Sequence, residues 1–343
     1  MWIGLILAAV LFGWFMWGVQ WPLLWESLRG VKLWAVAGAC LLVLSEFFMR
    51  AFRWRILLKP VHPNAPVGPL LSAILIGAAA NTLLPARAGE IAKPLVASKK
   101  LNVPFPAVLA TAVMERVYDI FGLLCVLITM VIVLPAQPGD GSAHDAEMVY
   151  KLKLYGGIFG ATALAAMAVF FVLASKGEAA KGLFHRITAL APEPVARPFN
   201  HLFDGFVQGL GSARDLPGML KAAAISAGIW FNGALAISLL FIAFGFDLSF
   251  GAACFTAVAI ALAVVLPQAP GFLGVFQVAM EQTMLLWSVE PTGAKAFAML
   301  FWAVSFLPVT TLGLLALWRE GMSLRELWSR DGEPSTQPAP QVR

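Results

Sequence analysis

The sequence predicts an all-α membrane protein with about six transmembrane helices and two re-entrant helical hairpins, arranged as an inverted repeat. Composition is the first reason: 60% of the 343 residues are hydrophobic and 13% are charged, whereas a soluble domain has about 25% charged residues. The second reason is a series of apolar runs long enough to cross a bilayer. The third is the recurrence of Pro-x-x-x-Gly at corresponding places in the two halves of the chain.

The first two apolar runs are each long enough to span the membrane. Residues 2–19 are predicted to be a retained helix, because the run lacks the basic start and the small-residue cleavage site of a signal peptide. A short link at 20–32 leads to the second span, at 33–49, whose Glu46 can pair with Arg50 one turn later. The basic residues that follow are expected to form a cytoplasmic exit from this helix.

The third apolar run is too short to span. Residues 70–84 cover about 22 Å at 1.5 Å per residue, and the hydrocarbon core is about 30 Å thick. The run ends at Pro85 and Gly89, and lysines follow closely. This predicts a re-entrant hairpin with a broken tip at 85–89, since irregular backbone at membrane depth must be buried in protein or line a cavity. Residues 104–134 form the next span, tilted or broken because of its length.

The second half repeats this order with a cytosolic insert. Apolar residues at helical spacing within the insert predict a helix that lies on the membrane surface. The second hairpin breaks at Pro267-x-x-x-Gly271, the counterpart of Pro85-x-x-x-Gly89. The elements are an acidic loop at 135–150, a span at 152–174, the insert at 175–220 with Phe199, Leu202, Phe203, Phe206 and Leu210, a span at 222–244, hairpin limbs at 250–266 and 272–287, and a span at 296–317.

The basic residues set the orientation. Four segments expected in the cytoplasm hold 18 of the 24 Lys and Arg residues, in line with the positive-inside rule. Both termini are then cytoplasmic, and the two halves of the chain have opposite orientations. The cytoplasmic segments are 50–68, 87–103, 175–221 and 319–343.

The domain organisation follows from this path. Residues 1–320 are expected to form a single transmembrane domain, with halves at about 1–150 and 151–320. Residues 321–343 are polar and rich in proline, which predicts a disordered cytosolic tail.

Five ionisable residues within 33 positions lie in or beside segments expected at membrane depth: Arg87, Glu90, Glu115, Arg116 and Asp119. Such residues usually face a bundle interior or a wet cavity. Glu115 and Asp119 share a helical face and would repel each other unless an arginine or a proton intervenes. Two interpretations stay open: a structural ion-pair lock, and a site whose guanidinium groups bind a phosphate headgroup.

Four stretches of the sequence resemble the lysylphosphatidylglycerol synthase transmembrane-region family of flippase-like membrane proteins. The resemblance covers nearly the whole chain and implies a role in moving polar lipids across the bilayer. Some family members carry a cytosolic aminoacyl-transferring domain, which is not expected here because only 25 residues follow Trp318. The last stretch departs from the family pattern, which ends in Glu where this chain has Gln277. The stretches are Arg50–Leu58, Asn81–Glu90, Glu115–Asp119 and Pro270–Gln277.

The predicted transport site combines these residues with polar residues of the second half. Arg87 and Arg116 would bind a phosphate, whereas Asn81 and Gln268 would cap the hairpin ends or bind a sugar or glycerol headgroup. Glu281 lies one turn beyond Gln277 on the same helical face. The candidate residues are Asn81, Arg87, Glu90, Glu115, Arg116, Asp119, Gln268, Gln277 and Glu281.

The expected function is a transporter of the bacterial cytoplasmic (inner) membrane, a flippase that moves a polar, anionic lipid between leaflets. No enzymatic activity and no cofactor are expected, because no nucleophile triad, metal-ligand spacing or nucleotide loop is visible. Coupling to a proton or sodium gradient stays open, as does a homo-oligomer. Membrane lipids are the expected partners, and nucleic acid is not. The alternatives are a membrane-embedded lipid-modifying enzyme and a small-solute or proton antiporter.

Overall fold

The computed structural model describes residues 2–84, 87–133, 177–188, 215–264 and 270–321, together with parts of 150–165 and 197–207. Every element in this part of the chain is helical. The elements are α1 (Trp2–Met16), α2 (Trp21–Arg29), α3 (Leu33–Leu58), α4 (Val67–Leu83), α5 (Gly89–Leu101), α6 (Phe105–Val133), α8 (Gly177–Thr188), α10 (Leu216–Phe244), α11 (Phe250–Ala263), η3 (Pro270–Phe272), α12 (Val275–Leu286) and α13 (Pro291–Arg319).

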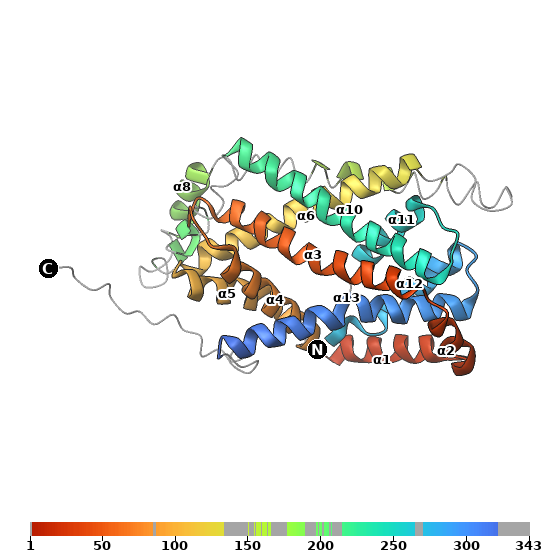
Figure 1. Cartoon of the computed structure of the whole chain (residues 1–343). Coiled ribbons are helices and arrows are strands. Elements are labelled where there is room, and N and C mark those ends of the chain that lie inside the picture. The colour runs from red at the N-terminus through yellow and green to blue at the C-terminus, as the bar shows by residue number, and fades with distance from the viewer. Residues whose placement is uncertain are drawn as a thin grey trace.

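Four of these helices, α3, α6, α10 and α13, are long and apolar enough to cross a membrane. They run lengthwise through the molecule (Figure 1), and α10 packs along both α3 and α6. The chain is a multi-pass integral membrane protein. The spans predicted at 2–19 and 152–174 stay predictions, because α1 has 15 residues and most of 152–174 lies outside the described residues.

Two pairs of shorter helices pack among the long ones. α5 begins shortly after α4 ends and packs against it, so the chain reverses direction between them. α11 and α12 pack against each other in the same way, on either side of η3. Figure 1 shows the α4–α5 pair toward the end of the molecule that holds α8, and the α11–α12 pair toward the end that holds α2. Because η3 packs against α4, the two reversals meet inside the molecule.

Close packing of the first pair depends on two glycines. A Cβ atom on Gly89 would lie 1.9 Å from the carbonyl oxygen of Gly77, and a Cβ atom on Gly77 would lie 2.7 Å from the Cβ of Lys93. A side chain at either position would therefore force α4 and α5 apart. At the second reversal Gly271 has a φ of +74°, the left-handed conformation that glycine adopts at little cost.

The apolar core is divided into two clusters. One surrounds α4 and α5 and includes Trp54 and Met114, and the other surrounds α11 and α12 and includes Phe241 and Phe297. Along α6 the first cluster ends at Tyr118 and the second begins with Leu123. Polar residues therefore have room between the two cores, near the middle of the long helices.

The structure corrects three details of the sequence interpretation. The second span does not end at residue 49: α3 continues to Leu58, because Ala51, Trp54 and Leu58 continue its buried apolar face. The link at 20–32 contains α2, whose Pro22 stands in the first turn, where proline is tolerated. For the span predicted as tilted or broken at 104–134, the broken form is wrong because α6 is one continuous helix, whereas the tilted form stays a prediction.

Candidate functional site

A fully buried arginine organises the centre of the molecule. Arg53 of α3 donates through Nη1 to Oδ1 of Asp119 at 2.6 Å and to Oγ of Ser226 at 2.8 Å. Its Nη2 lies 3.5 Å from Oε1 of Glu115. Glu115 and Asp119 come from α6 and Ser226 from α10, so one guanidinium joins three long helices. Glu115 and Asp119 share a face of α6 and would repel each other, and Arg53 of α3 is the arginine that lies between them.

A lysine from the first hairpin neutralises the other side of Glu115. The Lys93 ammonium of α5 bonds to Oε2 of Glu115 and lies 4.3 Å from the ring centroid of Trp54. The indole N–H of Trp54 donates to Oγ1 of Thr111 at 2.9 Å, which fixes the ring. A cation over an indole face is attracted to the ring quadrupole, so Trp54 provides a second favourable contact for Lys93.

Two further arginines form the outer layer of the same cluster. Arg50 donates through Nε to Oε1 of Glu46 at 2.8 Å, and its Nη1 lies 3.8 Å from Oδ2 of Asp119. Arg116 lies 3.3 Å from Oδ2 of Asp119 and 3.5 Å from Oε2 of Glu90. The side chains of Arg116 and Glu90 are 51% and 40% exposed, whereas those of Arg53 and Glu115 are 0% and 1% exposed. The cluster is thus buried on one side and open on the other.

These eight residues form a charge cluster with no net formal charge. Each acidic residue pairs with a basic one, and Asp119 pairs with three. Glu46 and Asp119 are close to the midpoints of α3 and α6, so the cluster lies at half the length of the long helices. Ion pairs this deeply buried are stable only when every member is paired. The members are Arg50, Arg53, Lys93, Arg116, Glu46, Glu90, Glu115 and Asp119.

Comparison with known proteins identifies the family. The sequence matches the lysylphosphatidylglycerol synthase TM region over residues 1–313. This chain belongs to that family. The chain is 28% identical over 290 residues to Glycosyltransferase AglD of Haloferax volcanii, covering 78% of this chain and 46% of the relative. It is 21% identical over 235 residues to the UPF0104 membrane protein MJ1078 of Methanocaldococcus jannaschii, covering 68% of this chain and 91% of the relative. This chain therefore spans less than half the length of AglD.

The family and these relatives support a membrane protein with a lipid-related function. Four predicted site residues of this family member, Glu90, Glu115, Arg116 and Asp119, come together in the charge cluster. Four other members were not predicted as site residues: Glu46, Arg50, Arg53 and Lys93. Of these, the sequence assigns Arg50, Arg53 and Lys93 to cytoplasmic segments; in the structure Arg53 is fully buried, and the side chain of Lys93 is 12% exposed. The sequence does contain an indication of these members: Glu46, Arg50 and Arg53 are spaced at i, i+4 and i+7, so they share one face of a helix.

The remaining predicted site residues lie elsewhere. Arg87, at the first reversal, donates to the backbone carbonyl of Val264 at the end of α11. Asn81 faces Gly89, and its Oδ1 is buried without a hydrogen-bond partner among the described residues. Gln277 accepts from the Gly274 N–H at 2.8 Å and so caps α12. Gln268 lies outside the described residues.

A second buried ion pair holds the other half together. Glu281 of α12 lies 3.2 Å from Nζ of Lys295 on α13. Lys295 also donates to the carbonyl of Phe15 at the end of α1, and its ammonium lies 4.9 Å from the Phe15 ring centroid. In each half, therefore, one Lys–Glu pair joins the second short helix to the long helix that follows.

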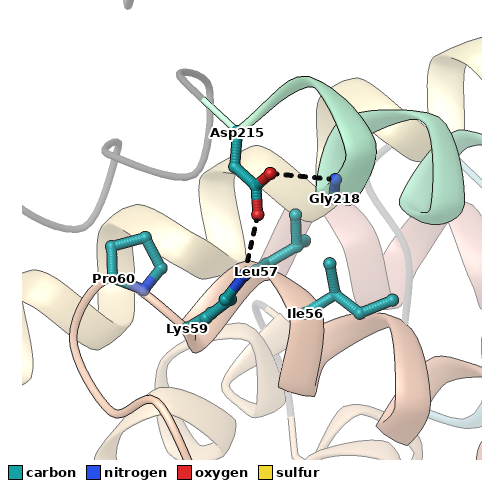
Figure 2. A pocket seen from close by; sticks show the side chains of 6 residues that line it. All are labelled: Ile56, Leu57, Lys59, Pro60, Asp215 and Gly218. Atoms are coloured by element: carbon teal, nitrogen blue, oxygen red, sulfur yellow. Dashed lines mark hydrogen bonds and ion pairs between the residues drawn. The ribbon is translucent and has the colours of Figure 1, made fainter.

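A small cavity of about 290 Å³ lies where α3 ends and α10 begins. Figure 2 shows Asp215 accepting from the Gly218 N–H and facing Lys59, whose Nζ is 3.2 Å from Oδ2. The Gly218 hydrogen bond and then Lys59 hold the pKa of the Asp215 carboxyl below its usual value. Asp215 caps the first turn of α10 and pairs with Lys59, so both polar side chains that line the cavity already have partners within the protein. Its lining consists of Ile56, Leu57, Lys59, Pro60, Asp215 and Gly218.

The predicted surface helix of the insert borders an apolar groove. Three of its aromatic and aliphatic residues line a groove of about 350 Å³ together with the first turn of α6 and Phe184 of α8. Phe184 and Phe203 stack with ring centroids 4.0 Å apart. The residues of the predicted helix that line it are Phe199, Leu202 and Phe203; its Phe206 and Leu210 lie outside the described residues.

The described residues offer no group of three or more His, Cys, Asp or Glu side chains arranged to hold a metal ion.

Proposed function

We propose that the protein is a lipid translocase that moves a polar, anionic lipid between the leaflets of the bacterial cytoplasmic membrane. One observation carries this proposal: a charge cluster at half the length of the long helices is open on one side. Ionisable residues at membrane depth are costly and usually face a bundle interior or a transport pathway. The pair Arg116–Glu90 is half-exposed, so charged groups are accessible at the edge of the cluster, whereas a purely structural lock would enclose all of its members.

The arrangement of the short helices supports the transporter class. Secondary transporters place broken helices from two inverted halves together near the membrane midplane, where the substrate binds. We interpret the α4–α5 and α11–α12 pairs as re-entrant hairpins of this kind. Arg87 of the first reversal bonds to the C-terminal carbonyl of α11, next to the second reversal. In both halves a Lys–Glu pair joins the second short helix to the long helix that follows it.

Arginine chemistry supports an anionic substrate. A guanidinium presents a planar fork of donors that matches two phosphate oxygens, and Arg116 is the cluster's most exposed guanidinium. The headgroup would bind beside Arg116 while the acyl chains remain in lipid. The four carboxylates of the cluster are candidates for carrying a coupling proton. A sodium gradient is the other driving force that this proposal leaves open.

A membrane-embedded lipid-modifying enzyme is the competing proposal, because AglD is named as a glycosyltransferase. Reconstitution of the purified protein in vesicles that contain a fluorescent anionic phospholipid separates the two. A translocase exposes inner-leaflet label to a membrane-impermeant quencher without changing the lipid, whereas an enzyme yields a modified lipid on chromatography. A small-solute antiporter would do neither and would instead exchange ions.

The expected result is protein-dependent quenching beyond the outer-leaflet fraction. Arg116→Lys keeps the charge but loses the fork, so the rate should fall sharply rather than mildly. Arg29→Ala, at an exposed residue of α2, is the matched control and should keep the rate of the unmodified protein. If no anionic lipid is quenched faster with protein than without it, the translocase proposal is wrong.

A further inference from the structure

The charge cluster contains one ion pair that differs from the others. Glu90 pairs with Arg116 at 3.5 Å, and its carboxylate accepts no hydrogen bond from a side chain in the part of the chain that is described. The other three carboxylates are held more firmly. Glu46 accepts from Arg50 at 2.8 Å, Asp119 accepts from Arg53 at 2.6 Å, and Glu115 bonds to Lys93.

An anion that enters an electroneutral cluster has to displace one of its carboxylates or leave a negative charge without a partner. The carboxylate that leaves must be free to move out of the packed protein, because a buried unpaired charge is costly. The Glu90 side chain is 40% exposed, whereas Glu46, Asp119 and Glu115 are 21%, 12% and 1% exposed. Glu90 is therefore the carboxylate that can be exchanged at the least cost.

The surroundings of this pair suit an amphiphile. Ile120 lies one turn from Arg116 on the same face of α6 and is 40% exposed. Ile91, the neighbour of Glu90, is 63% exposed. These exposed apolar side chains can contact acyl chains while the Arg116 guanidinium binds a charged head. A free phosphate ion would gain nothing from these isoleucines.

We infer that the Glu90 carboxylate is a placeholder, which occupies on Arg116 the position that the phosphate group of an anionic lipid takes when it binds. This inference rests on the proposed translocase function and identifies where the headgroup docks and what it displaces. Glu90 stands in the first turn of α5, directly after the first reversal. Its displacement also removes the ion pair between this turn and α6, so headgroup binding loosens the tip of the first hairpin.

The test compares two charge-matched variants, Glu90→Gln and Glu46→Gln. Each removes one negative charge from the cluster, and Glu46 is also paired with an arginine. Binding of dihexanoyl phosphatidylglycerol to the purified full chain in detergent is measured by calorimetry, with glycerol phosphate and dihexanoyl phosphatidylcholine as comparison ligands. Removal of the placeholder should tighten binding of phosphatidylglycerol to Glu90→Gln by up to about fivefold, because an exposed ion pair is worth up to about 1 kcal/mol. Glu46→Gln should show a clearly smaller gain.

Equal gains in the two variants would mean that only net charge matters, and the inference would be overturned. Glycerol phosphate that binds as tightly as dihexanoyl phosphatidylglycerol would overturn the lipid assignment, because the isoleucines would then contribute nothing. If the unmodified protein transports anionic lipids but Glu90→Gln binds no tighter, the inference alone fails. If Glu90→Gln binds tighter than Glu46→Gln but no lipid is transported, the placeholder stands and the translocase function fails.

Discussion

At the scale of single residues, the charge cluster combines a structural core with an exchangeable edge. Arg53 and Glu115 are almost completely buried and bonded to three helices, whereas Arg116 and Glu90 are half-exposed and loosely paired. The two interpretations that the sequence left open, an ion-pair lock and a phosphate site, therefore apply to different members of one cluster. Substitutions in the core should affect folding, and substitutions at the edge should affect substrate.

The core is tested by Arg53→Met. This substitution leaves Asp119 and Glu115 buried with one cation fewer, and breaking a buried pair by removing one partner costs about 3–5 kcal/mol. We expect a large fall in the thermal unfolding midpoint of the detergent-purified protein, or loss of the folded protein. Arg55→Met is the matched control, since Arg55 lies two residues away on the exposed face of α3. Similar unfolding midpoints for the two variants would refute the structural role of Arg53.

At the scale of elements, the two reversals are held by backbone geometry as well as by charge. Arg87 and Phe272 have φ angles of +54° and +57°, unusual for residues other than glycine, and each stands at one of the reversals. The Arg87 guanidinium lies at the C-terminal carbonyl of α11, where a cation is favoured by the helix dipole. At the second reversal, the indole N–H of Trp302 in α13 donates to the carbonyl of Gly271 at 2.7 Å. Each reversal is thus tied to a neighbouring helix.

Packing of the first hairpin is tested by Gly89→Ala. The added methyl group would meet the Gly77 carbonyl at 1.9 Å, and overpacking of this kind typically costs about 1–3 kcal/mol. We expect a lower unfolding midpoint and loss of lipid transport, because Glu90 and Lys93 would move with α5. Gly68→Ala on α4 is the control, since a Cβ atom there has nothing within 4 Å. A fully active Gly89→Ala protein would show that α4 and α5 are not packed this closely.

The first hairpin is bound at the end away from its tip by Glu320, a carboxyl group that titrates. Glu320, at the end of α13, accepts from Ser72 of α4 at 3.0 Å and bonds to Lys100 of α5. These hydrogen bonds, that from Lys100 first, hold the pKa of the Glu320 carboxyl below its ordinary value of 4.5. The stabilisation is therefore present above about pH 4.5 and is lost as the pH falls through the lower pKa of the folded state.

The corresponding prediction concerns Glu320→Gln. The substitution should lower stability at neutral pH by less than about 1 kcal/mol, because the pair is partly exposed. The difference from the unmodified protein should shrink as the pH falls below about 4.5, and it should vanish once the pH is below the lowered pKa of the folded-state carboxylate. Unfolding midpoints measured between pH 3 and pH 7 check this. If the difference in unfolding midpoint between the two proteins stays constant with pH, the ionised Glu320 carboxylate does not stabilise the fold.

At the scale of the whole molecule, apolar runs predicted more of the architecture than of the site. Run length was sufficient to predict the four long helices and the positions of both short pairs, because burial in lipid or protein requires apolar side chains over the whole run. The charge at Arg53 was interpreted as a helix exit, since a local sequence window cannot show a partner 66 positions away. The sequence interpretation misses the Lys93–Glu115 contact for the same reason, because Glu115 belongs to the next helix.

The orientation of the two halves stays a prediction, and it decides whether the two reversals enter from opposite sides. The positive-inside distribution places the acidic loop around Asp145 outside and the insert around His185 in the cytoplasm. We expect single cysteines at these two positions to react from opposite sides of the membrane, in a background that lacks Cys40, Cys125 and Cys254. An impermeant thiol reagent applied to intact cells should label Asp145→Cys directly and His185→Cys only after permeabilisation. If both cysteines are labelled in intact cells, the halves are not inverted, and the translocase proposal loses the common site near the midplane that it requires.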